Sequence, residues 1–202
     1  VSGRWAFDWD IPSAVRSLVV RDAADVSGVT SEVDFVFCAV DMKKDEIRAL
    51  EDAYAKSETP VVSNNSAHRG TPDVPMIIPE INADHVQIIA KQKERLGTRR
   101  GFIAVKPNCS IQSYTPALKA WEEFEPYEVV ATTYQAISGA GKTFKDWPEM
   151  VENIIPYIGG EEEKSEKEPL RVLGKYEDGE IKLAKEPVIT CQCIRVPVLN
   201  GH

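Results

Sequence analysis

Hydrophobic and polar residues in the first half of the chain alternate in blocks that predict a repeating order of strand and helix. The apolar and β-branched run 34–40 suits a strand that is buried on both faces. Apolar residues at helical spacing, with charges between them, predict an amphipathic helix over 45–56. Further short strands are expected at 59–63 and 101–105. Strands that alternate with helices in this way indicate an α/β fold with a parallel, doubly wound sheet.

A second helix of this half is expected from Asn82 to about Leu96. Asn82 is a favourable N-cap residue, and Gly97 is a residue that can end a helix. One face of this helix is expected to carry Val86, Ile89 and Ala90.

The second half contains longer strands, which we expect at 128–137 and 188–196 because both runs are rich in β-branched residues. The sequence Glu-Asp-Gly-Glu at 177–180 predicts a hairpin turn, which favours a partly antiparallel sheet. The charged run 161–168 predicts the start of a helix with acidic residues in its first turn. We expect the side chains of this run to form a solvated face.

The change of pattern predicts a domain boundary near 105–107. Residues 1–105 then form part of a doubly wound sheet of the kind found in nucleotide-binding domains, and residues 106–202 form part of an α+β domain. Because such an architecture does not define a function, the function has to be inferred from particular side chains.

Composition and charge narrow the classes of partner. The 202 residues carry a net charge of −8, which argues against nucleic acid and an anionic membrane surface, while a few local cations can still bind a small anion. The longest apolar run, 35–40, is much shorter than the roughly 18 residues that span a bilayer. The four cysteines include no Cys-x-x-Cys pair. This pattern predicts thiols in a reducing, cytoplasmic compartment, and neither a zinc site nor a disulfide framework.

Cys109 is a candidate nucleophile because it lies where a strand ends and a helix is expected to begin. The positive end of the helix dipole favours a thiolate there, and the unpaired N–H groups of the first turn can stabilise an oxyanion. The alternative is a small buried side chain at the end of a strand. Pro116 either kinks the expected helix or starts a second one.

Two loops are candidates for binding phosphate. The sequence Ser-Gly-Ala-Gly at 138–141 follows the strand that carries Gln135, and its backbone can approach a ligand closely, although a plain turn is the alternative. Arg69 ends the polar loop 63–69 after a strand, where ligands bind in open α/β sheets. A solvated loop explains this second pattern equally well.

Arg195 and His202 lie on the last expected strand and just after it. An arginine on a strand suits a carboxylate, and a histidine can act as a general base near neutral pH. The alternatives are a surface ion pair and a frayed terminal residue. His68 and His85 are expected to have no role in the chemistry.

Taken in order, these motifs resemble aspartate-semialdehyde dehydrogenase of the fungal and archaeal type. The resemblance covers nearly the whole chain, and its specificity comes from five motifs that occur in the family's order. The matching segments are Ser-Asn-Asn-Ser-Ala-His-Arg at 63–69, Val-Pro-Met-Ile-Ile-Pro-Glu-Ile-Asn at 74–82, Pro-Asn-Cys-Ser at 107–110, Gln-Ala-Ile-Ser-Gly-Ala-Gly at 135–141, and Arg-Val-Pro-Val at 195–198 followed by Gly-His at 201–202.

The resemblance implies the NADPH-dependent reductive dephosphorylation of L-aspartyl-4-phosphate to L-aspartate 4-semialdehyde and phosphate. This step belongs to the biosynthesis of lysine, threonine, methionine and isoleucine. In this interpretation Cys109 attacks the acyl phosphate and forms a thioester, which hydride reduces. His202 acts as the acid and base, and Gln135 orients the substrate or the intermediate.

The resemblance also implies the binding residues and no metal. Arg195 holds the α-carboxylate of the substrate, and Glu161 holds the α-ammonium, although Glu162 and Glu163 remain alternatives for this second role. Asn108 contacts both the substrate and the phosphate. The phosphate is bound by Arg69, Lys164 and Asn108, and the cofactor by Ser138, Gly139, Cys38 and Asn64.

The family's cofactor-binding turn, G-x-T-G-x-V-G, does not occur in the 202 residues, and neither does the segment that follows the family's catalytic histidine. We therefore expect an interior piece of a longer protein that forms a homodimer or homotetramer. Two alternatives remain open. One is a related reductase for another acyl donor, of the malonyl-CoA or N-acetylglutamyl-phosphate type, and the other is a non-catalytic dimerising fragment.

Overall fold

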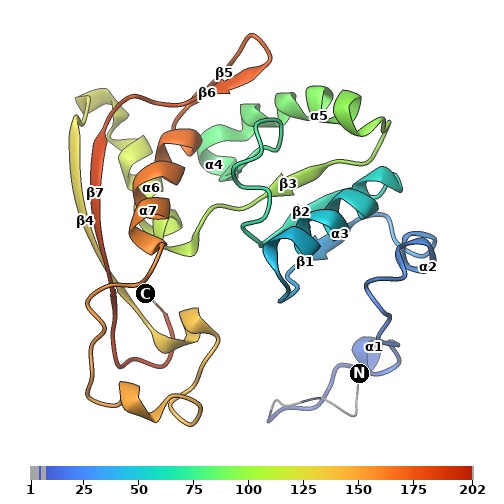
Figure 1. The fold of residues 1–202 in the computed structure, drawn as a ribbon, viewed down its shortest axis with the longest axis horizontal. Coiled ribbons are helices and arrows are strands. Elements are labelled where there is room, and N and C mark those ends of the chain that lie inside the picture. Colours follow the sequence, from blue (N-terminus) through green and yellow to red (C-terminus); the bar gives the residue numbers. More distant parts are fainter. Residues whose placement is uncertain (1–4, 6–7, 202) are drawn as a thin grey trace.

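The first half of the molecule is built on a three-stranded parallel sheet. The computed structural model describes residue 5 and residues 8–201. The strands β1 (Val36–Cys38), β2 (Val61–Ser63) and β3 (Ile103–Val105) lie in the order β1-β2-β3, with their carboxyl ends in register (Figure 1). This arrangement confirms the predicted parallel sheet, although each strand is shorter than expected. The helix α3 (Lys44–Lys56) confirms the predicted amphipathic helix.

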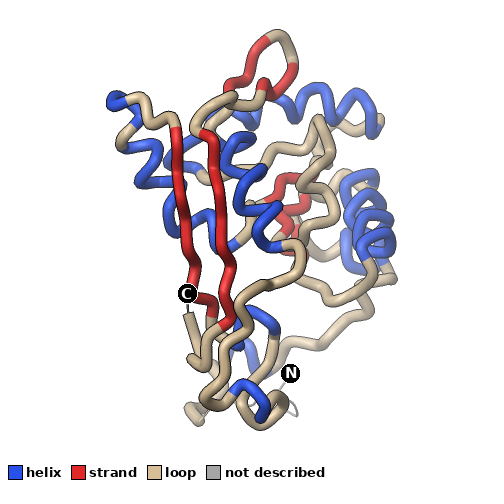
Figure 2. The backbone as a smooth tube through the Cα atoms, turned by 60° about the vertical axis from the view of Figure 1, so that its left-hand side comes forward, coloured by secondary structure: helices blue, strands red, loops and turns tan. Residues whose placement is uncertain are grey.

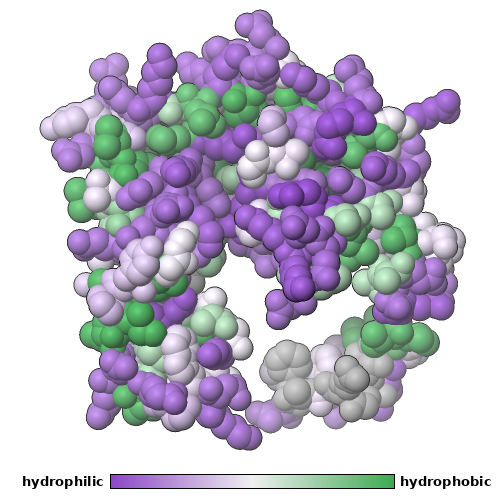
Figure 3. Space-filling view, viewed as in Figure 1, coloured by the Kyte–Doolittle hydropathy of each residue, from purple (hydrophilic) through white to green (hydrophobic). Residues whose placement is uncertain are grey.

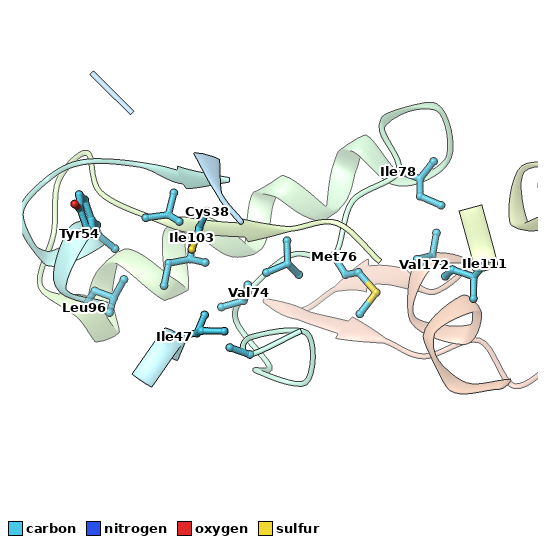
Figure 4. Close-up of a cluster of buried hydrophobic side chains, with 14 residues drawn as sticks. Cys38, Ile47, Tyr54, Val74, Met76, Ile78, Leu96, Ile103, Ile111 and Val172 are labelled. Carbon is cyan, nitrogen blue, oxygen red and sulfur yellow. The ribbon is translucent and has the colours of Figure 1, made fainter. Parts of the chain in front are cut away.

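One face of this sheet carries the main hydrophobic core. Side chains from all three strands pack there against Tyr54 of α3 and Leu96, and the core extends to Ile111 and Val172 of the second half (Figure 4). The prediction that the first strand is buried on both faces is wrong, because Phe37 is 74% exposed. Alternate residues of a strand point to opposite faces, and the packed core lies on one face only.

The predicted helix from Asn82 to Leu96 is divided into a short helix, a 3-10 segment and a second helix. Asn82 stands at the predicted N-cap position, directly before the 3-10 segment, but its side chain does not cap it. The side chain instead accepts a hydrogen bond from the N–H of Ile78 and donates one to the carbonyl of Met76. Val86 is exposed because a 3-10 helix has fewer residues per turn than an α-helix, so that His85 and Ile88 lie on the buried face instead. The predicted end at Gly97 is confirmed by its left-handed conformation. The three segments are α4 (Pro79–Asn82), a 3-10 helix at Ala83–Ile88 and α5 (Ile89–Leu96).

The two long strands of the second half, β4 (Glu128–Gln135) and β7 (Val188–Arg195), lie side by side (Figure 2). They pair in parallel over their whole length, so the prediction of a partly antiparallel sheet is wrong for these strands. The long connection between them carries a helix and returns the chain to the same end of the sheet, which permits parallel pairing. The predicted hairpin is confirmed and forms a separate antiparallel pair, with Asp178 and Gly179 in its turn. This pair consists of β5 (Lys175–Glu177) and β6 (Glu180–Lys182).

The helix α7 (Glu161–Val172) begins within the charged run, as predicted, but this run is not simply a solvated face. The carboxylate of Glu162 accepts a hydrogen bond from the backbone N–H of Cys193, and that of Glu166 accepts one from Cys191. These contacts use N–H groups along β7, and such groups must be paired when they are buried. Acidic side chains of α7 therefore hold the helix against the strand.

The remaining elements are short helices at the start of the chain, the helix α6 (Cys109–Ala120) after β3, and 3-10 segments of the second half. Pro116 lies inside a single helix, α6, and does not start a second one. No helix among the described residues is both long and apolar enough to cross a membrane. The space-filling view shows a hollow between the two halves (Figure 3). The remaining helices are α1 (Ser13–Arg16), α2 (Val26–Thr30), α6 (Cys109–Ala120) and 3-10 segments at Glu122–Phe124, Ile137–Ala140 and Pro148–Met150.

Candidate functional site

The thiol of Cys109 is presented at the N-terminus of α6, directly after the strand β3. Asn108 is the N-cap, and its side-chain oxygen accepts a hydrogen bond of 2.8 Å from the N–H of Ser110. The predicted helix start at Cys109 is thus confirmed. Cys109 is exposed, whereas the three other cysteines are buried, so the alternative of a small buried side chain is wrong. Its position places the sulfur at the positive end of the helix dipole.

The first turn of α7 contributes a carboxylate and an ammonium group to the same place. The side-chain amide of Asn108 donates a hydrogen bond of 2.9 Å to Oε2 of Glu161, and Nζ of Lys164 lies 2.6 Å from Oε1. Burial raises the pKa of Glu161, but the hydrogen bonds from Lys164 and Asn108 outweigh it and leave the pKa below its usual value. Of the three candidate glutamates, Glu162 contacts β7 and Glu163 is exposed. Glu161 is the one that contacts the Cys109 loop.

Gln135 lies at the end of β4 and reaches the start of α6. Its amide nitrogen donates a hydrogen bond of 2.8 Å to the hydroxyl of Ser110, and both side chains are buried. The predicted glutamine therefore contacts the residue that follows the predicted cysteine, although the two are distant in the sequence. Ser110 was not predicted as part of the site, even though it lies within the Pro-Asn-Cys-Ser motif.

Arg69, at the carboxyl edge of the parallel sheet, is linked to the same loop through Glu168. Its Nη1 lies 3.2 Å from Oε1 of Glu168, whose other oxygen accepts a hydrogen bond of 2.6 Å from the N–H of Asn108. Burial, followed by the nearby charge of Arg69, lowers the pKa of Lys106. Sequence reasoning missed Glu168 and Lys106. Glu168 follows Glu161 by two helical turns, so helical spacing is a signal that could have identified it.

A cleft of 340 Å³ opens between the polar loop after β2 and the helix α7. Arg69 and Lys164 both line it, together with Lys167 and Glu168. Two of the three residues predicted to bind phosphate therefore share one cleft, and the third, Asn108, is not among the residues that line it. A positively lined cleft of this kind can hold a small anion in a chain whose overall charge is negative.

Arg195 is buried rather than exposed, so the alternative of a surface ion pair is wrong. Only 5% of the residue is exposed, and its Nη1 donates a hydrogen bond of 2.7 Å to the carbonyl of Ala136. Gln135 and Arg195 are direct partners in the register of β4 and β7. The ends of the two long strands therefore place these side chains next to each other. His202 lies outside the described residues.

In the loop after β4, backbone N–H groups that were candidates for binding a ligand form hydrogen bonds within the fold. The N–H of Ser138 donates to the carbonyl of Leu199, that of Gly139 to Ala136, and that of Gly141 to Ser138. Ser138 and Gly139 are exposed, but their N–H groups are used within the fold. This geometry favours the turn interpretation of the loop over the binding of a phosphate by its backbone.

Cys38 and Asn64 lie at the carboxyl edge of the parallel sheet, where the N–H of Asn64 donates to the carbonyl of Cys38. The Cys38 thiol is buried, which raises its pKa, and it accepts a hydrogen bond from the side chain of Asn65. The side chain of Asn64 is exposed. This edge fits the polar groups of a nucleotide through Asn64 and backbone atoms, whereas the Cys38 thiol is turned into the core.

His68 and His85 are both buried within the fold. His85 contacts Asn82 and the carbonyl of Gly174. His68 lies 3.6 Å from a carboxylate oxygen of Asp52 and 3.0 Å from the hydroxyl of Thr71. Among the parts of the chain that the structure describes, no group of three or more histidine, cysteine, aspartate or glutamate side chains could hold a metal ion.

Two family models match the chain. Residues 3–89 match the model described as "Semialdehyde dehydrogenase, NAD binding domain". Residues 116–202 match the model described as "Semialdehyde dehydrogenase, dimerisation domain". The two matches fall on the two halves that differ in their sheets, and the Cys109 loop lies between them.

Curated relatives and solved structures agree with these matches. The chain is 39% identical over 199 residues to an aspartate-semialdehyde dehydrogenase of Methanothermobacter thermautotrophicus, with 98% of this chain and 55% of the relative covered. It is 35% identical to the protein of that name from Cryptococcus neoformans, of which it covers 56%. A crystal structure of the Candida albicans aspartate semialdehyde dehydrogenase with NADP is 30% identical, with a TM-score of 0.81 over 97% of this chain and 56% of that one. The chain thus spans somewhat more than half the length of these relatives.

Proposed function

The chain belongs to the semialdehyde dehydrogenase family, and from this premise we propose that Cys109 is the nucleophile of an NADP-dependent aspartate-semialdehyde dehydrogenase. The reaction is the reductive dephosphorylation of L-aspartyl-4-phosphate to L-aspartate 4-semialdehyde, in the biosynthesis of lysine, threonine, methionine and isoleucine. One observation carries the proposal: the exposed Cys109 thiol lies at the start of α6, and two carboxylates of α7 bind its loop, one of which also pairs with Arg69 of the first half.

The first step is the attack of the Cys109 thiolate on the carbonyl carbon of the acyl phosphate. A carbon–sulfur bond forms, the bond from carbon to the phosphate oxygen breaks, and phosphate leaves with the electron pair. The positive end of the α6 dipole stabilises the charge that develops on the carbonyl oxygen. Arg69 and Lys164, which line one cleft, bind the departing phosphate with Asn108.

The cofactor, when bound, supplies the hydride that reduces the Cys109 thioester to the aldehyde level. We propose that the exposed side chain of Asn64, the backbone of Cys38 and the exposed Ser138 and Gly139 hold it. His202 is proposed to donate and accept the proton at the reacting oxygen. Gln135, held by Ser110, orients the acyl group beside the sulfur.

The amino-acid part of the substrate is proposed to be held by a pair of opposite charges. Arg195 uses one nitrogen for the carbonyl of Ala136, and its remaining donors bind the α-carboxylate. Glu161 binds the α-ammonium, and its lowered pKa keeps it ionised at neutral pH. An acyl donor that lacks the ammonium group, such as malonyl-CoA, makes no ionic contact with this carboxylate, which favours an amino-acid substrate.

We further propose which domain each half belongs to, how the subunits assemble, and in which compartment the enzyme works. Residues 1–105 are part of the NADP-binding domain, and residues 106–202 are part of the catalytic and dimerisation domain of a homodimer or homotetramer. The match to a dimerisation model and the exposed apolar side chains on β4, such as Val130 and Tyr134, support self-association. The four thiols without disulfides support a reducing, cytoplasmic setting.

The test is the substitution Cys109→Ala in the protein that carries this chain. Phosphate-dependent oxidation of aspartate semialdehyde, followed by the absorbance of NADPH, is expected to fall to background because the nucleophile is removed. The matched control is Cys191→Ala, which removes a buried thiol from β7 and is expected to leave turnover intact. Turnover that persists in Cys109→Ala contradicts the proposed role, and equal rates with malonyl-CoA contradict the proposed substrate.

A further inference from the structure

The side chain of Glu168 bridges two loops that come from neighbouring strands of the parallel sheet. It is 11% exposed, and its two oxygens contact Nη1 of Arg69 at 3.2 Å and the N–H of Asn108 at 2.6 Å. Arg69 belongs to the loop after β2, and Asn108 belongs to the loop after β3. Glu168 itself lies on α7, so a helix of the second half holds together two loops of the first sheet's carboxyl edge.

This bridge determines the orientation of Arg69. One terminal nitrogen of Arg69 faces Glu168, and the other donates a hydrogen bond of 3.2 Å to the carbonyl of Asn64. Its buried Nε has no hydrogen-bond partner among the described residues. Because two of its three nitrogens are held, the guanidinium is fixed in one plane beside the cleft that it shares with Lys164.

The same carboxylate also acts on the nucleophile loop. Its second oxygen holds the N–H of Asn108, the residue that caps α6 immediately before Cys109. Its charge lies among cations, because Arg69 and Lys106 are close to it. A buried carboxylate that is paired and fully hydrogen-bonded can hold such a geometry, whereas breaking the pair leaves an uncompensated buried charge.

We propose that Glu168 is a positioning residue, which holds Arg69 and the Asn108 loop in one fixed relation so that the departing phosphate and the Cys109 sulfur are aligned. This inference rests on the proposed function of Cys109 and Arg69. Glu168 acts through Arg69 and Asn108 and does not touch the substrate.

Two variants separate the two contacts of Glu168. In Glu168→Gln the side-chain oxygen still accepts the N–H of Asn108, but the amide presents N–H groups to Arg69 and loses the charge. We expect the KM for phosphate to rise about tenfold, as for the loss of one hydrogen bond between charged groups, with kcat within about twofold of the wild type. In Glu168→Ala both contacts are lost, so kcat is expected to fall as well.

A double variant tests whether Glu168 acts through Arg69. Once Arg69→Ala has raised the KM for phosphate, adding Glu168→Gln is expected to raise it no further, because the group that Glu168 orients is absent. Glu94→Gln, which removes an exposed charge from α5, is the control and is expected to match the wild type. Additive effects of the two substitutions, or an unchanged KM in Glu168→Gln, overturn the inference.

A second readout does not depend on the proposed reaction. Iodoacetamide alkylates Cys109, the exposed thiol, and mass spectrometry of its peptide gives the rate at increasing concentrations of inorganic phosphate. Phosphate is expected to protect Cys109, and about tenfold more phosphate is expected to be needed in Glu168→Gln. If the wild type does not oxidise aspartate semialdehyde but this shift occurs, the proposed function fails and the positioning role stands. If phosphate does not protect the wild type, or the shift is absent, the positioning role is overturned.

Discussion

The two halves of the molecule differ in the length of their strands and in the size of the hydrophobic core that packs against those strands. The first half has strands of three residues, yet these strands lie over a continuous core that includes Val61, Ile103 and Val105. The main sheet of the second half, β4 with β7, has strands of eight residues, but the buried cluster of this half consists of three side chains of β7 with a few partly buried neighbours. Strand length therefore does not measure how much apolar surface an element buries.

The two halves also differ in what they contribute to the molecule, since one holds loops of the site and the other carries an exposed apolar surface. The core of the first half holds the carboxyl edge of its sheet in register, where the loops that carry Asn64 and Asn108 begin. In the second half, α7 contacts the strand β7 through acidic side chains, while apolar side chains such as Val130 stay exposed on β4. The first half is thus held by a packed core, whereas the second half keeps exposed apolar side chains on β4. Such an exposed apolar surface is typical of an interaction surface.

The largest expected effect comes from removing core volume in the first half. Ile103→Ala on β3 creates a cavity at a fully buried position and is expected to lower the free energy of unfolding by about 2–5 kcal/mol. The matched substitution in the second half is Val130→Ala on β4, where the side chain is 73% exposed. It is expected to change stability by no more than about 0.5 kcal/mol. Urea unfolding of both variants measures the contrast, and equal losses would remove the distinction between the halves.

A smaller effect is expected from adding a methyl group where the first half is tightly packed. A Cβ at Gly101 would overlap the carbonyl of Ala55 at the end of α3, so Gly101→Ala is expected to cost about 1–3 kcal/mol. A Cβ at Gly159 in the second half meets no atom within 4 Å, and Gly159→Ala is the control. Thermal unfolding is expected to show a lower Tm for Gly101→Ala only. A loss of Tm in the control as large as that in Gly101→Ala would contradict the contrast in packing.

The smallest expected effect is a pH dependence that arises in the first half. Backbone N–H groups of Arg99, Gly101 and Arg100 donate to the carboxylate of Glu58 and lower its pKa to about 2. The folded state thus binds this proton less readily than the unfolded state, so the contribution is complete above pH 4.5 and is lost as the pH falls toward about 2. Glu58→Gln is expected to flatten this part of the stability curve.

The control for this titration is Glu180→Gln in the exposed hairpin of the second half. The pKa of Glu180 is lowered by Lys182, its neighbour on the same strand, and an exposed ion pair of this kind contributes little to stability. Urea unfolding at several pH values between 4.5 and about 2 compares the two variants with the wild type. A curve that Glu180→Gln flattens as much as Glu58→Gln would show that the acid sensitivity does not arise at Glu58.

Much of the fold and part of the site could be predicted from local patterns. The start of α6 at Cys109 follows from Asn108, whose side chain caps the helix within two residues of itself. The end of the helix at Gly97 and the hairpin turn follow from residues that tolerate a positive φ. The pairing of β4 with β7 could not be predicted, because strand propensity carries no information about the direction of a distant partner.

The sequence by itself indicated which segments form helices and strands, which thiol follows a strand end, and which residues resemble a known catalytic set. These features depend on neighbours within one or two turns of the chain. Only the tertiary structure decided that Phe37 is exposed, that Arg195 is buried, and that Glu168 joins the two loops. The partners of Glu168 lie 99 and 60 residues away in the chain. A carboxylate in a charged run is solvated or buried according to what its helix packs against, and that packing is set by the whole fold.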